Sequence, residues 1–204
     1  MARRLAILGA SGHGKVVADC AELCGWQSIR FFDDAWPELS DNGSWAIKGN
    51  ADDLLSSVAD FDGVLVAIGN NRIRCEKLQV LRQAGANLVS LVHPSAVVSR
   101  YATVGEGVVI FAGAVVNVDS RIGDGVIINT SASVDHDCVL AEGVHISPGV
   151  RLAGGVTIGE RSWIGIGASV RQLVSVGADV VVGAGAAVVN DVGDGLTVVG
   201  VPAR

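Results

Sequence analysis

The sequence predicts an α/β domain over residues 1–92, followed by an all-β parallel β-helix over residues 93–204. Two observations predict this division. In the first part, apolar runs of strand length alternate with helical segments, as they do in a parallel sheet covered by helices. In the second part, a branched aliphatic residue recurs at every sixth position. Neither an α-helix nor a single strand requires that period, but a chain coiled in stacked rungs does.

The first part has the element order of a small, truncated Rossmann-like domain. Its links are short, and glycine or paired polar residues follow the apolar runs. Residues 35–50 have no clear pattern and are expected to form an irregular loop. The expected elements are a strand at 5–8, the glycine-rich loop GASGHGK at 9–15, a helix at 16–24, a strand at 29–32, a strand at 63–68, a helix at 72–84 and a strand at 88–92.

The second part is defined by sixteen hexads that run without interruption from Val98 to Val188. The residue two positions before each aliphatic residue is always Ala, Val, Ser or Cys. Side chains alternate along a strand, so both residues are expected to point into the coil. The residue after each aliphatic position is often Gly, Asn or Asp, and we expect the turn there. Three hexads close one triangular coil, an architecture also found in purely structural rods.

Composition excludes several classes of function. The formal net charge is −6 and no run of basic residues occurs, so nucleic acid is not an expected partner. The four cysteines, at positions 20, 24, 75 and 138, are expected to be free thiols of a reducing cytosol. No apolar run is long enough for a membrane span, and glycines interrupt the apolar start of the chain too early for a signal peptide. A cytoplasmic protein is therefore expected.

Two histidines interrupt the hexads at positions that do not face the interior. His136 lies two residues after Val134, at a corner, whereas His145 precedes Ile146 on the outward face. They are nine residues apart, and therefore on different sides of one coil, so they share a groove only if two subunits pack together. Asp135 and Asp137 flank His136, and a neighbouring carboxylate suits a histidine that acts as a general base.

A metal site is the main rival chemistry for these histidines. Trimeric β-helix carbonic anhydrases bind zinc through three histidines, but this β-helix offers only His136 and His145. His93 lies at its base and His13 in the other domain. The spacing of a three-ligand site is absent, so no metal is expected.

The glycine-rich loop suggests a nucleotide pocket in the first domain. Residues 9–15 fit G-x-x-x-x-G-K, but Val16 stands where a P-loop requires Ser or Thr. The loop is either a turn without a ligand or a set of backbone N–H groups that hold phosphate. Asp33 and Asp34 end the next strand and are expected to accept hydrogen bonds from a ribose or base. Gly69 begins a third polar turn at the same sheet edge.

The combination of motifs resembles the NeuD/PglD-type sugar acetyltransferases, and the resemblance covers nearly the whole chain. The residues that carry it are GASGHGK, Asp33-Asp34, AIGNN-x-IR at 67–74, Asn129-Thr130-Ser131, Asp-His-Asp around His136, His145-x-Ser147, Ala153-Gly154 and the terminal GVPAR. The resemblance implies a left-handed coil and a homotrimer with CoA between neighbouring helices. It is strongest to enzymes that N-acetylate UDP-linked 4-amino-4,6-dideoxy sugars for surface glycans.

The resemblance also implies a role for each matching residue. His136 would be the general base, Asp137 would orient it, Asn129 would position the substrate or the base, and the Gly154 N–H would stabilise the oxyanion. His145, Ile166 and Ala184 fall where the family contacts acetyl-CoA, the co-substrate. The residues that match the nucleotide-sugar site are Ser11, Gly12, His13, Asp33, Asp34 and Gly69.

Three alternatives remain open from the sequence. GDP-perosamine could replace a UDP sugar as acceptor, and a sialic-acid-type hydroxyl could replace the amine. A nucleotide-sugar-binding scaffold trimer without activity is the third. Because the hexad register is unbroken, the chain lacks the external loop that many hexapeptide enzymes carry, and close relatives lack this loop too. Residues 35–50, in contrast, form a longer segment than expected beside the sugar pocket.

Overall fold

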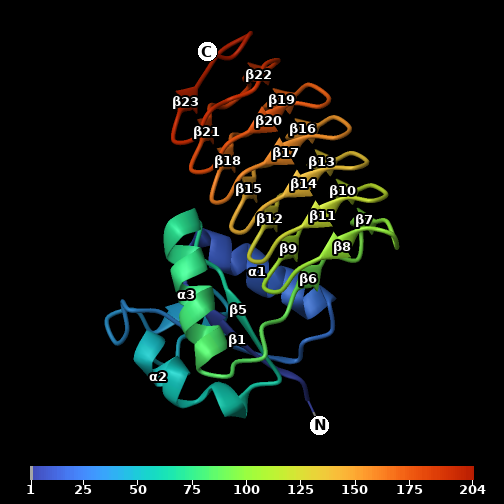
Figure 1. Ribbon diagram of the computed structural model, residues 1–204. Helices are drawn as coiled ribbons and strands as arrows, with labels where there is room; N and C mark the ends of the chain where they lie inside the picture. The colour runs from blue at the N-terminus through green and yellow to red at the C-terminus, as the bar shows by residue number, and fades with distance from the viewer. Residues whose placement is uncertain (1) are drawn as a thin grey trace. The chain divides into compact units, whose positions relative to one another are not determined.

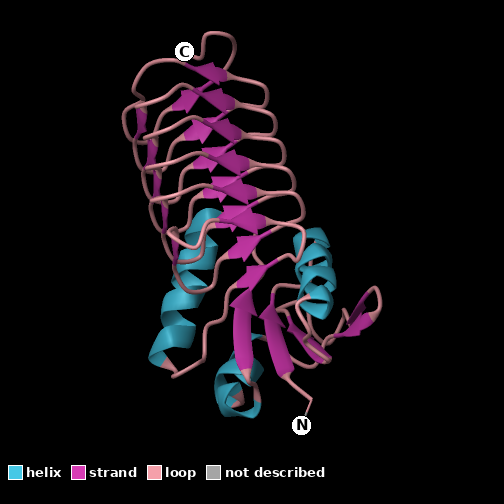
Figure 2. Cartoon of the chain, turned by 90° about the vertical axis from the view of Figure 1, so that its right-hand side faces the viewer, coloured by secondary structure: helices cyan, strands magenta, loops and turns pink. Residues whose placement is uncertain are grey.

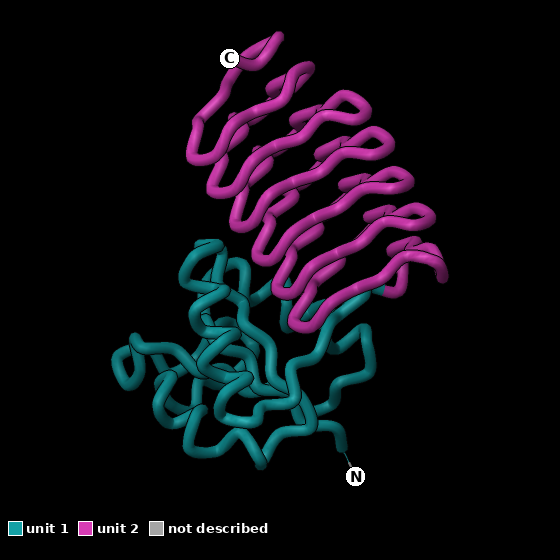
Figure 3. The backbone as a smooth tube through the Cα atoms, in the orientation of Figure 1, with its two compact units in different colours: residues 1–93 teal, residues 94–204 magenta. Residues whose placement is uncertain are grey.

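The computed structural model describes residues 2–204, which divide into two compact units: a first unit that ends at His93 and a second unit, Pro94–Arg204 (Figure 3). The first is an α/β unit and the second is a left-handed parallel β-helix, so the predicted fold class is confirmed. None of the helices within residues 2–204 has both the length and the apolar character that crossing a membrane requires.

The first unit is built on a parallel sheet with helices on both sides of the strands (Figure 2). Strand β1 is fully apolar and buried after its first residue, as is usual where both faces of a parallel sheet are covered. The strand order is β2 (Ser28–Phe32), β1 (Arg4–Leu8) and β5 (Gly63–Val66), and the helices are α1 (Gly12–Leu23), α2 (Ala51–Ser56) and α3 (Asn71–Gln83) (Figure 1).

Helix α1 begins at Gly12, four residues earlier than the expected helix at 16–24, so the prediction of a loop over residues 9–15 is wrong. Close packing explains the difference. A Cβ placed on Gly14 would lie 2.4 Å from the carbonyl oxygen of Gly9, and one on Gly9 would lie 2.8 Å from that of Ala67. These two glycines let the helix start against the strand ends, and this contact outweighs their poor helix propensity.

Residues 35–50 are not the irregular loop that was expected. They contain an antiparallel hairpin of β3 (Asp41–Asn42) and β4 (Trp45–Ala46), after which Ile47 bridges to Phe31 in β2. Helix α2, which the apolar pattern did not reveal, follows with a capping box between Asn50 and Asp53. A 3-10 turn, Val58–Asp60, comes next.

The strand expected at 88–92 is only partly formed. Leu88 makes an isolated bridge to Val64, and β6 covers only Leu91–Val92.

The second unit consists of two-residue strands, and each strand from β7 to β22 ends at an aliphatic residue of the hexad series. Strands stack at intervals of 18 residues; for example, Val116 pairs with Val134. The strands of sheet 1 are β7 (Val97–Val98), β10 (Val115–Val116), β13 (Ser133–Val134), β16 (Arg151–Leu152), β19 (Ser169–Val170) and β22 (Ala187–Val188). Those of sheet 2 are β8 (Thr103–Val104), β11 (Arg121–Ile122), β14 (Val139–Leu140), β17 (Thr157–Ile158) and β20 (Ser175–Val176). Those of sheet 3 are β9 (Val109–Ile110), β12 (Ile127–Ile128), β15 (His145–Ile146), β18 (Trp163–Ile164), β21 (Val181–Val182) and β23 (Thr197–Val198).

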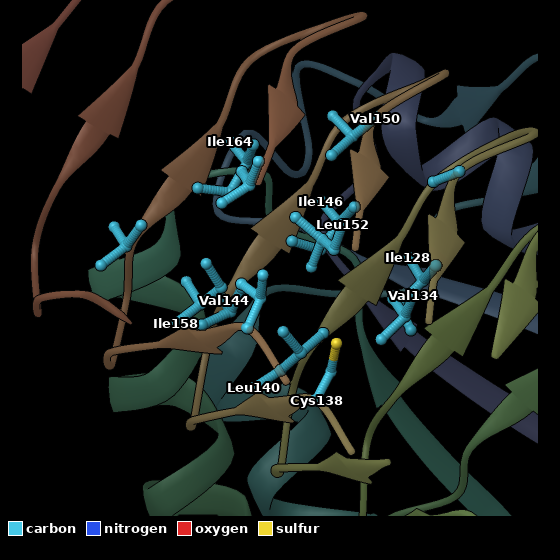
Figure 4. Close-up of a cluster of buried hydrophobic side chains, with 14 of the residues drawn as sticks. Ile128, Val134, Cys138, Leu140, Val144, Ile146, Val150, Leu152, Ile158 and Ile164 are labelled. Carbon is cyan, nitrogen blue, oxygen red and sulfur yellow. The ribbon is translucent and has the colours of Figure 1, made fainter. Parts of the chain in front are cut away.

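The interior of the coil follows the predicted pattern. Aliphatic residues such as Leu140 and Ile146 and the small residues two positions before them, such as Cys138 and Val144, are buried together (Figure 4). The register holds from Val98 to Val188 and changes only afterwards, where the spacing between paired strands falls to 16 residues.

The corners differ from the expectation in one respect. The residue three positions after each aliphatic residue has a positive φ in fourteen consecutive corners, from Gly107 to Gly185. The residue directly after the aliphatic position is not the turn, because it still donates a ladder hydrogen bond, as Gly123 does to Leu140. Glycine is favoured at the positive-φ position, but six corners hold other residues: Asp119, Ser131, Asp137, Arg161, Leu173 and Asp179.

Candidate active site

His136 lies in the corner between β13 and β14, with its side chain 56% exposed. Its Nδ1 is 2.7 Å from Oδ2 of Asp137, the positive-φ residue of that corner. This hydrogen bond is the main cause that raises the pKa of His136; loss of solvent contact lowers that pKa in part, and the charges of Asp135 and Asp137 raise it further. With Nδ1 held by Asp137, Nε2 is the nitrogen that can accept a proton from a substrate.

Asp135 fixes the backbone on the other side of His136. Its Oδ1 accepts hydrogen bonds from the His136 backbone N–H at 2.8 Å and from Asn117 Nδ2 at 2.9 Å. These bonds lower the pKa of Asp135. Its backbone carbonyl also accepts a hydrogen bond from Ser120 Oγ. Asp135 therefore fixes the backbone conformation of the corner, while Asp137 fixes the orientation of the His136 imidazole ring.

Gly154 lies one coil farther along and underneath the imidazole. A Cβ on Gly154 would be 2.5 Å from both Cε1 and Nε2 of His136, so only glycine leaves room for the ring. The Gly154 N–H donates no hydrogen bond within residues 2–204, whereas the adjacent Gly155 N–H donates to the His136 carbonyl at 2.9 Å. A backbone N–H beside a base is the arrangement that stabilises an oxyanion in acyl transfer.

Sheet 3 carries a groove that brings together four of the predicted residues. Asn129, His145, Ile166 and Ala184 line a cavity of about 520 Å³. His145 is on the outward face as expected but is only 7% exposed, because the Trp163 ring stacks on it with centroids 4.8 Å apart. Trp163 in turn donates from Nε1 to Ser147 Oγ at 2.7 Å.

Trp163 was not singled out from the sequence, although its position gave a signal. It stands exactly one coil after His145, in the same outward column of sheet 3. Outward aromatic residues are unusual among these hexads, since the other strand positions of the column beyond His145 hold Val181 and Thr197. The groove is otherwise largely aliphatic and suits an extended, partly apolar ligand.

Asn129 lies with His145 rather than with His136 of the same chain. Its Nδ2 is 3.4 Å from Nε2 of His145. The corner that holds His136 joins sheets 1 and 2, so it is opposite sheet 3 in the triangular cross-section. The base and the groove of one chain therefore do not share a face.

The first unit contains a second cavity, of about 240 Å³, at the carboxyl ends of the sheet strands. Ser11, Asp33, Asp34 and Gly69 line it, in agreement with their predicted grouping. Lys77, which belongs to none of the sequence motifs, also lines it from α3, with Nζ 3.7 Å from Oδ2 of Asp34.

The two carboxylates of this cavity already have partners in the protein. Asp33 accepts hydrogen bonds from the backbone N–H groups of Ala10, at 2.6 Å, and Ala35, at 3.0 Å. Asp34 accepts one from the N–H of Ala51 at the start of α2. Both therefore shape the cavity wall, and Asp33 in particular ties the glycine-rich turn to the end of β2.

Gly12 and His13 lie in the first turn of α1 and are not among the residues that line the cavity. Burial and the positive charge of Arg74 lower the pKa of His13 to about 4, so its ring is neutral at pH 7. Arg74 is fully buried and donates to the carbonyl oxygens of Ile68 and Gly69. This explains the Arg of the AIGNN-x-IR motif, which holds the turn after β5.

Within residues 2–204, no three His, Cys, Asp or Glu side chains are grouped so as to hold a metal ion.

Comparison with known proteins agrees with the two-unit architecture. The family model described as the PglD N-terminal domain matches residues 4–81. A curated UDP-N-acetylbacillosamine N-acetyltransferase from Bacillus subtilis (strain 168) is 36% identical over 113 residues, which cover 54% of this chain and 52% of that protein. The chain thus spans about half the length of this curated relative.

Two solved structures resemble the chain over nearly its full length. The acetyltransferase domain of PglB from Neisseria gonorrhoeae FA1090, in complex with acetyl coenzyme A, is 46% identical with a TM-score of 0.95, and the match covers 100% of this chain and 99% of that one. PerB from Caulobacter crescentus, in complex with CoA and GDP-perosamine, is 42% identical with a TM-score of 0.93, covering 98% and 95% of the two chains.

Proposed function

The chain belongs to the PglD-type family of sugar acetyltransferases, and we propose that it transfers the acetyl group of acetyl-CoA to the 4-amino group of a nucleotide-activated amino-dideoxy sugar. One observation carries this proposal. His136 is hydrogen-bonded through Nδ1 to Asp137 while its Nε2 lies over the backbone of Gly154. A base and an N–H donor thus meet at one exposed corner, as direct acyl transfer requires.

In the proposed reaction, the sugar amine forms a bond to the thioester carbonyl carbon while His136 Nε2 accepts the amine proton. The charge on the carbonyl oxygen is stabilised by the Gly154 N–H, a type of contact worth about 3 kcal/mol. The carbon–sulfur bond then breaks, and CoA leaves as a thiolate that takes the proton back from His136. Asp137 holds the imidazole in one tautomer and favours its charged form during the reaction.

We assign acetyl-CoA to the groove of sheet 3, where His145, Ile166 and Ala184 meet. This groove is opposite the His136 corner of the same chain, so the acetyl group must reach His136 from another copy. A homotrimer with rotational symmetry pairs the corner of one subunit with the groove of its neighbour at three equivalent sites.

We assign the nucleotide part of the acceptor to the cavity of the first unit that contains Ser11, Asp34 and Gly69. A UDP-linked sugar is the favoured acceptor because the curated relative is named for one. A GDP-linked sugar is the second candidate, favoured by PerB, whose structure contains GDP-perosamine. Since acetyl-CoA and sugar nucleotides are made inside the cell, we place the reaction in the cytoplasm.

A CoA-release assay with UDP- and GDP-linked 4-amino sugars tests the proposal. We expect acetylation of at least one of them and a fall of about 100-fold or more in turnover for His136→Ala. His93→Ala provides a histidine control outside both cavities. Absence of CoA release with every amino sugar would overturn the proposed activity, and full turnover by His136→Ala would remove its role as base.

A further inference from the structure

Leu173 has an unusual conformation at the corner between β19 and β20. Its φ is +61°, in the left-handed region that is unfavourable for a bulky side chain. Burial does not compensate, because the residue is 77% exposed. A strained and exposed apolar residue that persists in the fold is a candidate for a functional contact.

Leu173 also lies on the edge of the β-helix that holds the base, between sheets 1 and 2, two coils after the corner of His136. Its backbone N–H donates to the Gly154 carbonyl at 3.0 Å, and its Cδ2 would be 2.7 Å from a Cβ placed on Gly155. His136 reaches the same pair of glycines from the preceding coil, with its ring over Gly154. His136 and Leu173 therefore converge from opposite sides on the Gly154–Gly155 backbone.

From this arrangement we propose that Leu173 is a specificity-determining residue that contacts the C6 methyl group of a 6-deoxy sugar. The inference rests on the proposed function, since it places a 4-amino sugar at His136. It adds a choice among acceptors, namely a preference for a methyl over a hydroxymethyl group at C5.

The substituents of the sugar ring indicate which group Leu173 contacts. An amine within hydrogen-bond reach of His136 Nε2 brings two neighbouring substituents to this corner, the C3 hydroxyl and the C6 group on C5. The Leu173 side chain has no hydrogen-bonding atom, so it complements the methyl group and not the hydroxyl. A C6 hydroxyl pressed against it would lose its water without gaining a partner.

The test compares two acceptors that carry the same nucleotide: a 4-amino-4,6-dideoxy sugar and its counterpart with a hydroxyl on C6. The measured quantity is the ratio of their kcat/KM values, which does not depend on the fraction of folded enzyme. We expect the unmodified protein to prefer the 6-deoxy acceptor by about tenfold or more.

Two variants change Leu173 without adding backbone strain. Leu173→Asn keeps a similar size, adds polarity and tolerates a positive φ, whereas Leu173→Gly removes the side chain altogether. Both should reduce the preference for the 6-deoxy acceptor by about fivefold or more. Leu196→Asn makes the same chemical change at another exposed leucine of the second unit and should leave the ratio unchanged.

The outcomes separate this inference from the proposed function. If the unmodified protein acetylates neither acceptor, the proposed function fails and the inference fails with it. If acceptors are acetylated but both Leu173 variants keep the original ratio, only the inference is overturned. An equal loss for both acceptors, together with a change of oligomeric state by light scattering, would assign Leu173 to subunit packing instead.

Discussion

The imidazole of His136 rests on the backbone of Gly154, one coil farther along, with no space for a side chain between them. A Cβ on Gly154 would lie 2.5 Å from both Nε2 and Cε1 of His136. The ring is the exposed end of a side chain and the glycine is part of a hydrogen-bonded coil. If the two were forced apart, the ring would move and the coil would stay.

Gly154→Ala is therefore expected to preserve the fold and impair turnover. Gly154 is not among the glycines with a positive φ, so alanine brings no backbone strain there. The displaced ring would lose its contact with Asp137, and kcat should fall about 100-fold, while the free energy of unfolding changes by about 0.5 kcal/mol or less. Steady-state kinetics and urea unfolding measure the two quantities.

Gly193→Ala is the matched control, because a Cβ there meets only Leu196 at an ordinary 3.8 Å. If Gly154→Ala turned over normally, the ring position would not matter for catalysis. A crystal structure of the variant with the ring unmoved would contradict the steric argument itself.

Asp137→Asn should move the acidic limb of the pH–rate profile to lower pH. The hydrogen bond that His136 donates to Asp137 raises the pKa of His136 above 6.5, and the base works only when deprotonated, so kcat/KM rises with pH through that raised pKa. Without the carboxylate, His136 loses its proton at lower pH but is a weaker and less well oriented base. The plateau rate should fall about tenfold or more.

Asp119→Asn controls for the change of charge. Asp119 occupies the equivalent corner one coil earlier, with the same φ of 59° as Asp137. Replacement of Asp119 should leave the acidic limb of the pH–rate profile at the same pH. An unchanged limb in Asp137→Asn would mean that another group controls the profile.

Asn42→Ala should weaken binding of the sugar nucleotide without affecting acetyl-CoA. Asn42 is only 5% exposed, and its Nδ2 donates to the Ser11 carbonyl at 3.1 Å, so the β3–β4 hairpin braces the glycine-rich turn. Loss of the donor costs about 1–3 kcal/mol and releases the turn. We expect the KM for the sugar nucleotide to rise about tenfold while the KM for acetyl-CoA is unchanged.

Asn87→Ala removes a similar bond to a carbonyl, that of Asp62, which is not part of the cavity lining. A rise in the KM for both substrates, or the same effect in Asn87→Ala, would show general destabilisation in place of a local brace.

The hexads predicted the β-helix accurately because one repeated requirement determines it. Each coil must fill a narrow interior with one branched and one small residue, as at Leu140 and Cys138, and nothing outside the coil can alter that demand. The corner position of His136 follows from the same register. The strict six-residue period therefore predicts the corner position of the candidate base from the sequence alone, because that position depends on no contact between distant residues.

Features that depend on contacts between distant residues were missed. The pairing of Ile47 with Phe31 organises the hairpin that contains Asn42, and no local sequence pattern predicts such a bridge. The stacking of Trp163 on His145 joins residues one coil apart, and alternation along a strand marks His145 as outward-facing without showing that it is covered. Glycines at the start of α1 were interpreted as a loop because their role is to permit close packing.

The 18-residue spacing between stacked strands also limits how this protein can change in length. An insertion of one residue in a strand would turn every later interior residue outward, whereas a duplication of a whole coil would add one rung of about 4.8 Å and keep every face. The β-helix can therefore lengthen only by whole coils. Because His136, Gly154 and Leu173 occupy three successive coils, a rung added between any two of them would separate parts of the candidate active site, while one added beyond them would only lengthen the scaffold.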